Sequence, residues 1–148
     1  MSSGLDVVIT GRGLITPLGF GLLENLKALI EGKSGISYIQ QWHDLGLESQ
    51  IAGKVNTDFE CHACDRKQLR FMPDSAKMAV EATFEAITEA GYTKETLPGD
   101  SMAVIVGCAG SGYNDFYKAY TSFEKYRTAR RVSPFTIPKI MPSSAVSN

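Results

Sequence analysis

Cysteine is scarce in this sequence, which has three among 148 residues, at positions 61, 64 and 108. An odd and low number excludes a disulfide framework and is typical of proteins kept in a reducing compartment. No apolar run approaches the ~20 residues that span a bilayer, and the opening residues MSSGLDVVITG lack the basic and apolar regions of a secretory signal. We therefore expect a cytoplasmic protein with no membrane partner.

An excess of charge of either sign is also missing, because 15 basic and 16 acidic side chains leave a formal net charge of -1. A dedicated nucleic-acid binder is usually strongly basic, so we expect no nucleic-acid partner. The hydrophobic fraction of 43% is ordinary for a globular protein and excludes disorder. The length fits one domain or a piece of a larger one.

The hydrophobic pattern predicts alternating strands and helices. Two apolar runs, at 6–10 and 101–107, are typical of buried strands, and each leads into a glycine turn. Apolar residues at helical spacing predict helices over 22–30, 76–90 and 113–130. This order indicates an α/β protein. Two strands alone do not make a stable sheet, so either further strands lie within 34–65 or the chain is the front part of a longer fold.

Two local features refine this prediction. The helix over 76–90 carries a stripe of small and apolar side chains, which predicts close packing on another helix or a sheet, while its glutamates at 81, 85 and 89 are expected mostly in water. Near the end of the chain, Pro134, Pro138 and Pro142 are expected to exclude a regular helix before residue 142.

Several motifs suggest chemistry but have simpler structural interpretations. Gly11-x-Gly13 follows a predicted strand, yet a third glycine is replaced by Thr16, so a tight turn is favoured over a nucleotide loop. Cys61-x-x-Cys64 has zinc-like spacing without a second ligand pair, so we predict no metal site. Cys108 needs a general base to act as a nucleophile, and the sequence pairs it with none.

Two basic clusters and one glycine turn remain as candidate sites. The clusters predict positive patches that dock an acidic partner or a phosphate, or else solvated helix faces. The turn at 107–112 allows a ligand or another chain to approach the backbone around Ser111. The basic residues are Arg66, Lys67 and Arg70, followed by Lys125, Arg127, Arg130 and Arg131.

The same stretches resemble the N-terminal part of the β-ketoacyl-acyl-carrier-protein synthases, in particular the bacterial elongating types I and II. The order and spacing of the matching motifs hold over essentially the whole chain, residues 1–148. They are VITGxGxxxPxG at 8–19, GKSGI at 32–36, DRKxxRFMxD at 65–74, AG at 90–91, VGxxGxG at 106–112, and SPF followed by KxM at 133–141.

This resemblance implies a thiolase-like fold of layered helices and sheets (α-β-α-β-α), of which the chain supplies most of the N-terminal half, usually in a homodimer. The implied reaction transfers an acyl group from acyl carrier protein to a cysteine, and a decarboxylated malonyl unit then attacks the thioester. It needs no metal or redox cofactor, because the phosphopantetheine arm arrives on the carrier protein. The family's nucleophilic cysteine and its histidines lie beyond Asn148, so no catalytic residue maps onto this sequence.

Other family roles do map onto residues of the chain. Lys67 and Arg70, with Arg127 and Arg130, match basic residues that dock the acidic carrier protein. Gly110 and Ser111 match the turn beside the acyl pocket near the dimer interface, although Ser111 is small and polar for a position that gauges chain length. Met141 matches a residue that reaches into the partner's pocket.

Three alternatives for the function stay open. An elongating synthase is the main hypothesis, and a truncated chain is then expected to be inactive alone. A non-catalytic partner subunit of the chain-length-factor type keeps the fold and the dimer surface but lacks the cysteine. A phosphate-binding α/β module that uses the glycine turn is the third hypothesis.

Overall fold

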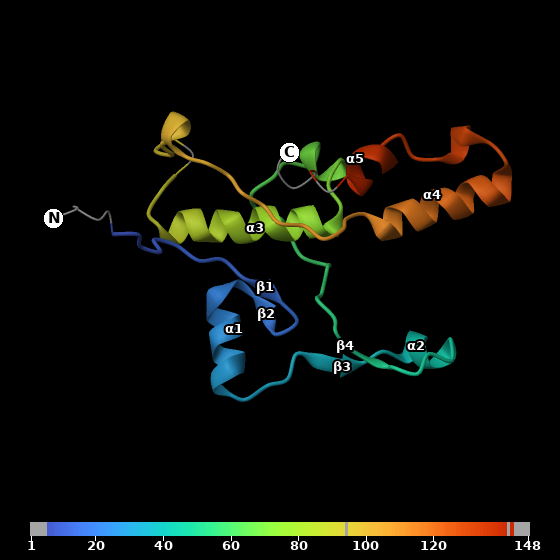
Figure 1. Cartoon of the computed structure of the whole chain (residues 1–148), viewed down its shortest axis with the longest axis horizontal. Coiled ribbons are helices and arrows are strands. Elements are labelled where there is room, and N and C mark those ends of the chain that lie inside the picture. Colours follow the sequence, from blue (N-terminus) through green and yellow to red (C-terminus); the bar gives the residue numbers. More distant parts are fainter. Residues whose placement is uncertain (1–5, 94, 142, 144–148) are drawn as a thin grey trace. The chain divides into compact units, whose positions relative to one another are not determined.

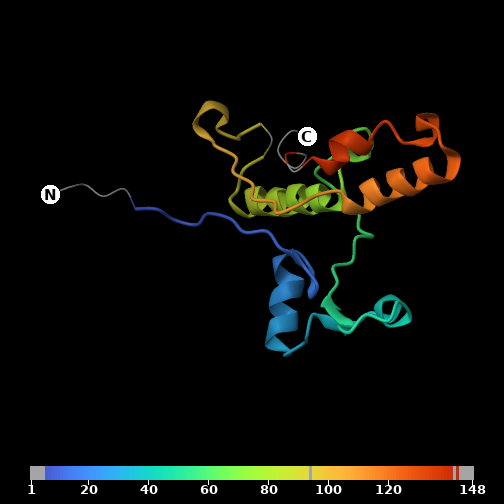
Figure 2. The same ribbon diagram turned by 45° about the vertical axis from the view of Figure 1, so that its right-hand side comes forward.

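The computed structural model describes residues 6–93, 95–141 and 143, and it forms two compact units (Figures 1 and 2). Unit 1 comprises Met1–Phe59 with Ala82–Thr93, and unit 2 comprises Glu60–Glu81 with Lys94–Asn148. The longest helix, α3 (Asp74–Glu89), contributes residues to both units.

In its described residues, unit 1 contains two short antiparallel strand pairs, two complete helices and the last part of α3. Strand β1 (Ile15–Thr16) pairs with β2 (Gly19–Phe20), and β3 (Ile36–Tyr38) pairs with β4 (Ile51–Gly53). The helices are α1 (Gly21–Ile30) and α2 (Gln40–Asp44). Strands β3 and β4 are the further strands that the sequence allowed within 34–65, and α1 confirms the helix expected over 22–30.

Asn25 on α1 organises the turn that precedes its helix. The Asn25 side chain is buried, and its amide nitrogen donates to the carbonyls of Gly19 at 3.0 Å and Gly21 at 2.7 Å. Its amide oxygen accepts a hydrogen bond from the Thr16 hydroxyl. Because a buried amide without partners is costly, these bonds fix the β1–β2 turn against the start of α1.

The alanine stripe of α3 packs closely on the segment that leads into β1. A Cβ atom at Gly11 would overlap the Ala86 carbonyl, and one at Gly13 would overlap the Ala82 carbonyl. Only glycine lets the two backbones approach this closely. The small-residue stripe therefore packs closely in unit 1, as predicted, but against a segment without regular secondary structure and not against a helix or a sheet.

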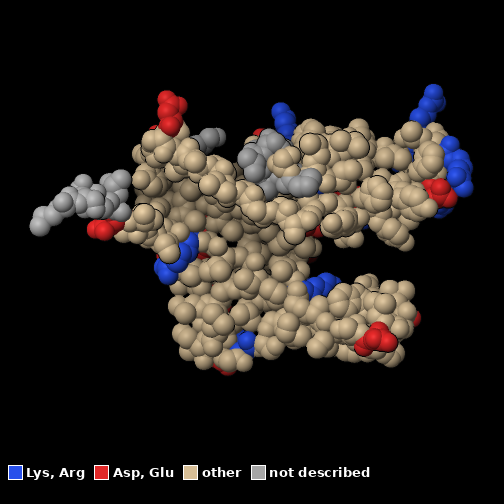
Figure 3. Space-filling view, in the orientation of Figure 1, with Lys and Arg blue, Asp and Glu red and all other residues tan. Residues whose placement is uncertain are grey.

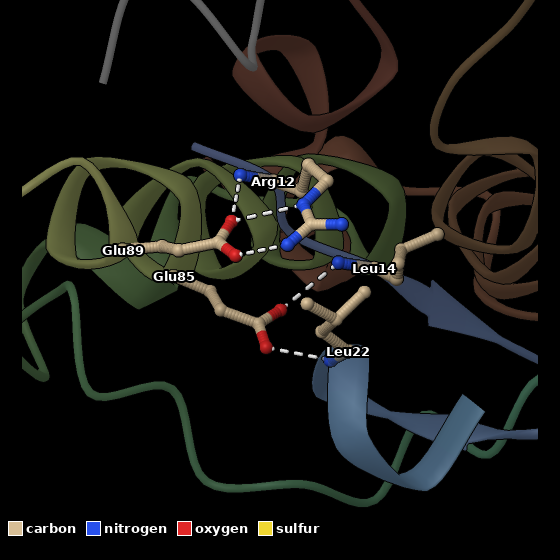
Figure 4. Close-up of polar contacts among 5 residues, drawn as sticks. All are labelled: Arg12, Leu14, Leu22, Glu85 and Glu89. Atoms are coloured by element: carbon tan, nitrogen blue, oxygen red, sulfur yellow. Dashed lines mark hydrogen bonds and ion pairs between the residues drawn. The ribbon is translucent and has the colours of Figure 1, made fainter. Parts of the chain in front are cut away.

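Glu85 and Glu89 both bind backbone N–H groups of unit 1 (Figure 4). Glu89 remains exposed, as expected, whereas Glu85 is partly buried. The Glu85 carboxylate accepts hydrogen bonds from the backbone N–H groups of Leu14 at 3.0 Å and Leu22 at 2.6 Å. Glu89 accepts from the backbone N–H of Arg12 and forms an ion pair with its guanidinium. These backbone N–H groups have no strand partner, so the carboxylates of α3 accept their hydrogen bonds instead.

Unit 2 is built from the first turns of α3, the helices α4 (Tyr113–Tyr126) and α5 (Thr136–Ile140), and short 3-10 turns. The turns are η1 (Gln68–Arg70), η2 (Gly99–Ser101) and η3 (Ala129–Arg131). Helix α5 lies beside the start of α4 in both views (Figures 1 and 2). Met72 and Ala76 are fully buried and form the centre of this unit.

Two strand predictions are wrong for this structure. Neither 6–10 nor 102–107 forms a strand, and Val7 and Ile105 are 96% and 94% exposed. A strand needs a hydrogen-bonded neighbour along its length, and the described residues supply none to either segment. Apolar side chains that a paired strand would bury therefore remain uncovered in the part of the chain that the structure describes.

The expectation of no helix before Pro142 is also wrong, because α5 contains Pro138. Pro138 is the third residue of α5, where the missing N–H costs nothing since the first four N–H groups of a helix have no partner within it. The helix over 113–130 ends earlier than expected, at Tyr126. None of the helices in the described part of the chain has the length and apolar character needed to cross a membrane.

Candidate functional site

All candidate residues from the sequence belong to unit 2. They fall into a turn with a neighbouring methionine and two exposed basic clusters. The turn group is Gly110, Ser111 and Met141, and the basic residues are Lys67, Arg70, Arg127 and Arg130.

Glycine is required where the 110–112 turn enters α4. Gly112 is the N-cap of α4 and has φ +66°, a left-handed conformation that favours glycine. A Cβ atom there would overlap the Lys139 carbonyl and the Ile140 Cα of α5. The backbones of the turn and of α5 therefore lie in direct contact.

The Ser111 side chain joins three segments. It is buried, with 9% of the residue exposed. Its hydroxyl lies 3.1 Å from the Ser75 hydroxyl at the start of α3, and it donates to the Lys139 carbonyl of α5 at 3.4 Å. The Ser111 hydroxyl therefore has both of its hydrogen-bond partners inside the protein, and these bonds fix the turn in place. Sequence reasoning missed Ser75, whose position at a helix start suggested only capping.

A cavity of about 320 Å³ opens beside this turn. Its lining includes the hydroxyls of Ser75 and Ser111 and the side chains of Asp74, Asn114 and Asp115. These walls mix polar side chains with apolar surface. An apolar cavity of about 370 Å³ lies in unit 1, where Leu14, Leu22, Leu26, Leu29 and Ile36 contribute to its lining.

Lys139 and Met141 flank the end of α5. Lys139 forms an ion pair with Asp115 of α4 at 3.2 Å, and both side chains are about three-quarters buried, with 25% and 23% exposed. Met141 is the C-cap of α5 and is 48% exposed. The ion pair ties α5 to α4, whereas the Met141 side chain is free to meet another surface.

Lys67 and Arg70 are exposed on a short turn whose backbone is capped. The Asp65 carboxylate accepts from the N–H groups of Lys67 at 2.8 Å and Gln68 at 2.9 Å. This arrangement begins η1, in which Arg70 is the last residue. The two cations are therefore held on an ordered turn and point outward, as a docking surface requires.

Arg127 and Arg130 lie where the chain reverses after α4. Arg127 caps α4 in a left-handed conformation, φ 49°, and pairs with Glu124 at 3.1 Å. Arg130 belongs to η3, whose first turn is capped by the Thr128 hydroxyl. Arg131 packs over the Tyr126 ring at 5.2 Å. Lys and Arg side chains gather on the surface over this reversal (Figure 3).

The cysteines and histidines of the described residues belong to no group that could hold a metal ion. No cluster of three or more potential ligands occurs there. Cys108 donates its thiol proton to the Gly110 carbonyl at 3.2 Å, as a small structural residue does. Burial, followed by a hydrogen bond to Glu81, raises the pKa of Cys61 to about 11. A thiol protonated to that extent is a poor metal ligand at neutral pH.

Comparison with known proteins identifies the family. The model of the beta-ketoacyl synthase N-terminal domain matches residues 5–148. The 3-oxoacyl-(acyl-carrier-protein) synthase 1 of Haemophilus influenzae is 33% identical over 138 residues, which cover 93% of this chain and 34% of that protein. The chain thus spans about a third of the length of the curated relatives it matches.

Solved structures agree with this match. A β-ketoacyl synthase from Burkholderia phymatum superposes with a TM-score of 0.75 at 25% identity, over 95% of this chain and 35% of that one. The ishigamide ketosynthase/chain length factor gives a TM-score of 0.73 at 28% identity, over 90% and 33%. The α/β elements described above therefore have the arrangement found in thiolase-like enzymes, and the chain belongs to the β-ketoacyl synthase family.

Proposed function

We propose that this chain serves as the N-terminal part of a β-ketoacyl-acyl-carrier-protein synthase, an acyltransferase of fatty acid or polyketide synthesis. The observation that supports this most is the family match over residues 5–148, together with a relative of that activity at 33% identity. Residues 1–148 then form one portion of a single synthase domain in the cytoplasm.

The proposed reaction is a decarboxylative condensation. An acyl group moves from the carrier-protein thiol to a cysteine thiolate, and the carrier protein leaves as its free thiol. Malonyl-carrier protein then loses carbon dioxide, and its carbanion forms a carbon–carbon bond with the acyl carbon while the cysteine departs. Histidines stabilise the oxyanion charge. Cys108, His43 and His62 do not match these motif positions, so we place the reacting groups outside this chain and expect it to be inactive alone.

The basic residues of unit 2 are the proposed docking surface for acyl carrier protein. Lys67 and Arg70 on η1, with Arg127 and Arg130 at the α4 reversal, are all exposed and carried by ordered turns. An acidic partner is steered and oriented by such a surface. The phosphopantetheine arm comes with that partner, so we propose no resident cofactor.

The glycine turn and Met141 are proposed to border the acyl pocket and the dimer interface. Ser111 is fixed by its contacts with Ser75 and α5, which makes the turn a rigid wall. Met141 is half exposed and flexible enough to adapt to a partner surface. The partner at this interface is a second copy of the protein or a ketosynthase-like subunit.

A second candidate function is a non-catalytic partner subunit. The structural match to the ishigamide ketosynthase/chain length factor, whose name includes both kinds of subunit, supports it. In that case the same fold and docking surface serve a subunit that shapes the product without forming the thioester.

Acylation distinguishes these functions. The full-length protein is incubated with radiolabelled acyl-carrier protein and then with malonyl-carrier protein, and thioester formation and carbon dioxide release are measured. A synthase forms both, whereas a partner subunit forms neither until a ketosynthase is added. The 148-residue chain alone is the control, and a stable thioester on Cys61, Cys64 or Cys108 would contradict the assignment of the nucleophile to another part of the protein.

A further inference from the structure

A small cavity in unit 2 lies where α4, η3 and α5 meet, and its volume is about 190 Å³. Pockets for drug-sized ligands measure ~300–1,000 Å³, so this cavity suits a small ion. Its α4 residues are three or four positions apart, so they share one face of the helix. The polar lining includes Asp115, Lys118 and Ser122 of α4, Arg131 at the end of η3, and Thr136 and Lys139 of α5.

Positive charge exceeds negative charge in this lining. Lys118, Arg131 and Lys139 are cations, whereas Asp115 is the only acid among the residues that line the cavity. Asp115 pairs with Lys139 at 3.2 Å. Lys118 and Arg131 form no ion pair within the part of the chain that the structure describes. Two cations without a carboxylate partner at one small cavity favour the binding of an anion.

Thr136 adds a hydroxyl group that is available to a ligand. The residue lines the cavity and is only 8% exposed. Its backbone N–H donates to the Ser133 carbonyl at 3.1 Å, but its side chain makes no hydrogen bond to residues 6–93, 95–141 or 143. No fully enclosed side-chain oxygen in these ranges lacks a partner, so the Thr136 hydroxyl is reached from the cavity. It can therefore donate its proton to an anion there.

Contacts within unit 2 hold the charged groups around the cavity. The Ser122 hydroxyl donates to the Arg131 carbonyl at 3.0 Å, which fastens the end of η3 to α4. The Arg131 guanidinium lies 5.2 Å from the centre of the Tyr126 ring. The ion pair of Lys139 with Asp115 fastens α5 to the same helix. The groups that would meet an anion are thus placed before it binds, which lowers the cost of binding.

We propose that this cavity binds inorganic phosphate as the hydrogen phosphate dianion. Lys118 and Arg131 neutralise its charge, and the Thr136 hydroxyl donates to one of its oxygens. The proton that the dianion retains is donated to the Asp115 carboxylate. The site goes beyond the proposed function, in which none of these residues has a role. It is also separate from the glycine turn, because no residue of 107–112 lines the cavity.

The Asp115 carboxylate makes the site selective among tetrahedral anions. A carboxylate accepts a proton from a hydrogen-bond donor and repels an anion that has none to offer. Sulfate carries no proton at neutral pH. A phosphate monoester loses its last proton near about pH 6. At pH 8, inorganic phosphate is therefore the one of these three anions that still has a proton for Asp115.

Calorimetry of the full-length protein tests this proposal. Sodium phosphate, sodium sulfate and glycerol 3-phosphate are titrated separately at pH 8 and constant ionic strength, in a buffer that contains none of them. Phosphate is expected to bind one site saturably. The other two anions are expected to bind at least about tenfold more weakly, the size of one lost hydrogen bond to a charged group. Equal weak affinity for all three would indicate an adventitious ion only and would overturn the proposal.

Variants identify the groups that bind phosphate. Lys118→Gln with Arg131→Gln is expected to abolish saturable binding, and both side chains are exposed, so the fold is retained. Thr136→Val keeps the side-chain shape and is expected to weaken binding about tenfold. Lys125→Gln, an exposed change on α4 outside the cavity, is the control and leaves the affinity unchanged. Phosphate binding that survives the double change at 118 and 131 would place the site elsewhere and refute the proposal.

A last variant tests the selectivity itself. Asp115→Asn removes the carboxylate that accepts the phosphate proton and repels sulfate, so sulfate is expected to bind this variant about as tightly as phosphate does. Circular dichroism verifies that the variant is folded. A preference for phosphate that persists in folded Asp115→Asn would contradict the role of this carboxylate.

Discussion

Phe71 and Phe135 meet edge to face, with ring centroids 5.0 Å apart and planes at 87°. Phe71 directly follows Arg70 at the end of η1, and Phe135 precedes α5. The contact therefore ties the turn that carries one basic cluster to the segment that follows the other. In unit 2, it is the described aromatic pair that fixes η1 relative to α5.

This pair is expected to contribute a measurable coupling energy. Edge-to-face aromatic pairs add about 0.5–1.5 kcal/mol beyond burial. We predict that a double-mutant cycle of Phe71→Ala and Phe135→Ala, measured by urea unfolding, gives a coupling of this size. Phe116→Ala combined with Phe135→Ala serves as the control cycle, because Phe116 is 57% exposed on α4. Additive effects of the two changes at 71 and 135 would show that the rings do not cooperate.

Replacing the arginines that follow α4 with glutamate tests carrier-protein docking. Arg127→Glu together with Arg130→Glu is expected to weaken binding of acyl carrier protein on the order of tenfold, mostly through slower association. The loss shrinks at high salt, because added ions screen the same attraction in the unchanged protein. Binding is measured by surface plasmon resonance at two salt concentrations. Lys54→Glu, an exposed change in unit 1, is the matched control, and equal losses in both variants would remove the arginines from the docking surface.

Gly112 provides a test of the turn itself. Gly112→Ala places a methyl group against the Lys139 carbonyl and forces alanine into a left-handed conformation. We expect a loss of at least about 1–2 kcal/mol in the free energy of unfolding. Gly107→Ala is the control, because a Cβ atom at Gly107 meets nothing within 4 Å and its φ is not left-handed. Thermal unfolding that ranks the two variants equally would contradict the close approach of α5.

The pair of His62 and Glu81 predicts a specific pH dependence. The hydrogen bond to Glu81, with the attraction of its charge, raises the pKa of His62 above 6.5. Burial raises the pKa of Glu81, but hydrogen bonds led by the one from His62 outweigh it and hold that pKa below 4.5. The stabilisation from His62 is therefore complete below pH 6.5 and is lost as pH rises through its raised value. That from Glu81 is complete above pH 4.5 and is lost as pH falls through its lowered value.

Proton NMR of the two histidines checks this prediction. The His62 ring signal is expected to titrate above 6.5, and Glu81→Gln is expected to return its pKa toward the ordinary value. His43, whose ring neighbours are Gln40 and Asp44, is the internal control, because neither neighbour is changed in that variant. A His62 titration unchanged by Glu81→Gln would disprove the pairing in solution.

Local patterns predicted the helices well, because the information for a helix lies within a few turns of sequence. The apolar spacing that starts at Leu22 and the stripe that starts at Ala76 both correspond to observed helices. Gly32 and Gly91 follow the ends of these helices with positive φ. The buried strands failed for the opposite reason. A run such as Val7–Ile9 becomes a strand only when another segment pairs with it, and sequence periodicity does not contain that partner.

The candidate site was predicted in part. Exposure of Lys67, Arg70, Arg127 and Arg130 agrees with the basic patches seen in the sequence. The contacts of Ser111 with Ser75 and α5 were not predictable, because they join residues far apart in the chain. The same applies to Glu81, which looked like a solvated helical residue until the 61–64 turn was seen to fold around its carboxylate.

Glu85 and Glu89 supply to residues 12, 14 and 22 the acceptors that a neighbouring strand would otherwise offer. Their four-residue separation on α3 sets the distance between the backbone amides that they bind. The helix therefore fixes the path of residues 12–22 in unit 1. A one-residue insertion between them would turn one carboxylate by about 100° relative to the other. Substitution of the outward side chains of this segment would leave these hydrogen bonds in place. A change in the number of residues between Glu85 and Glu89 would not.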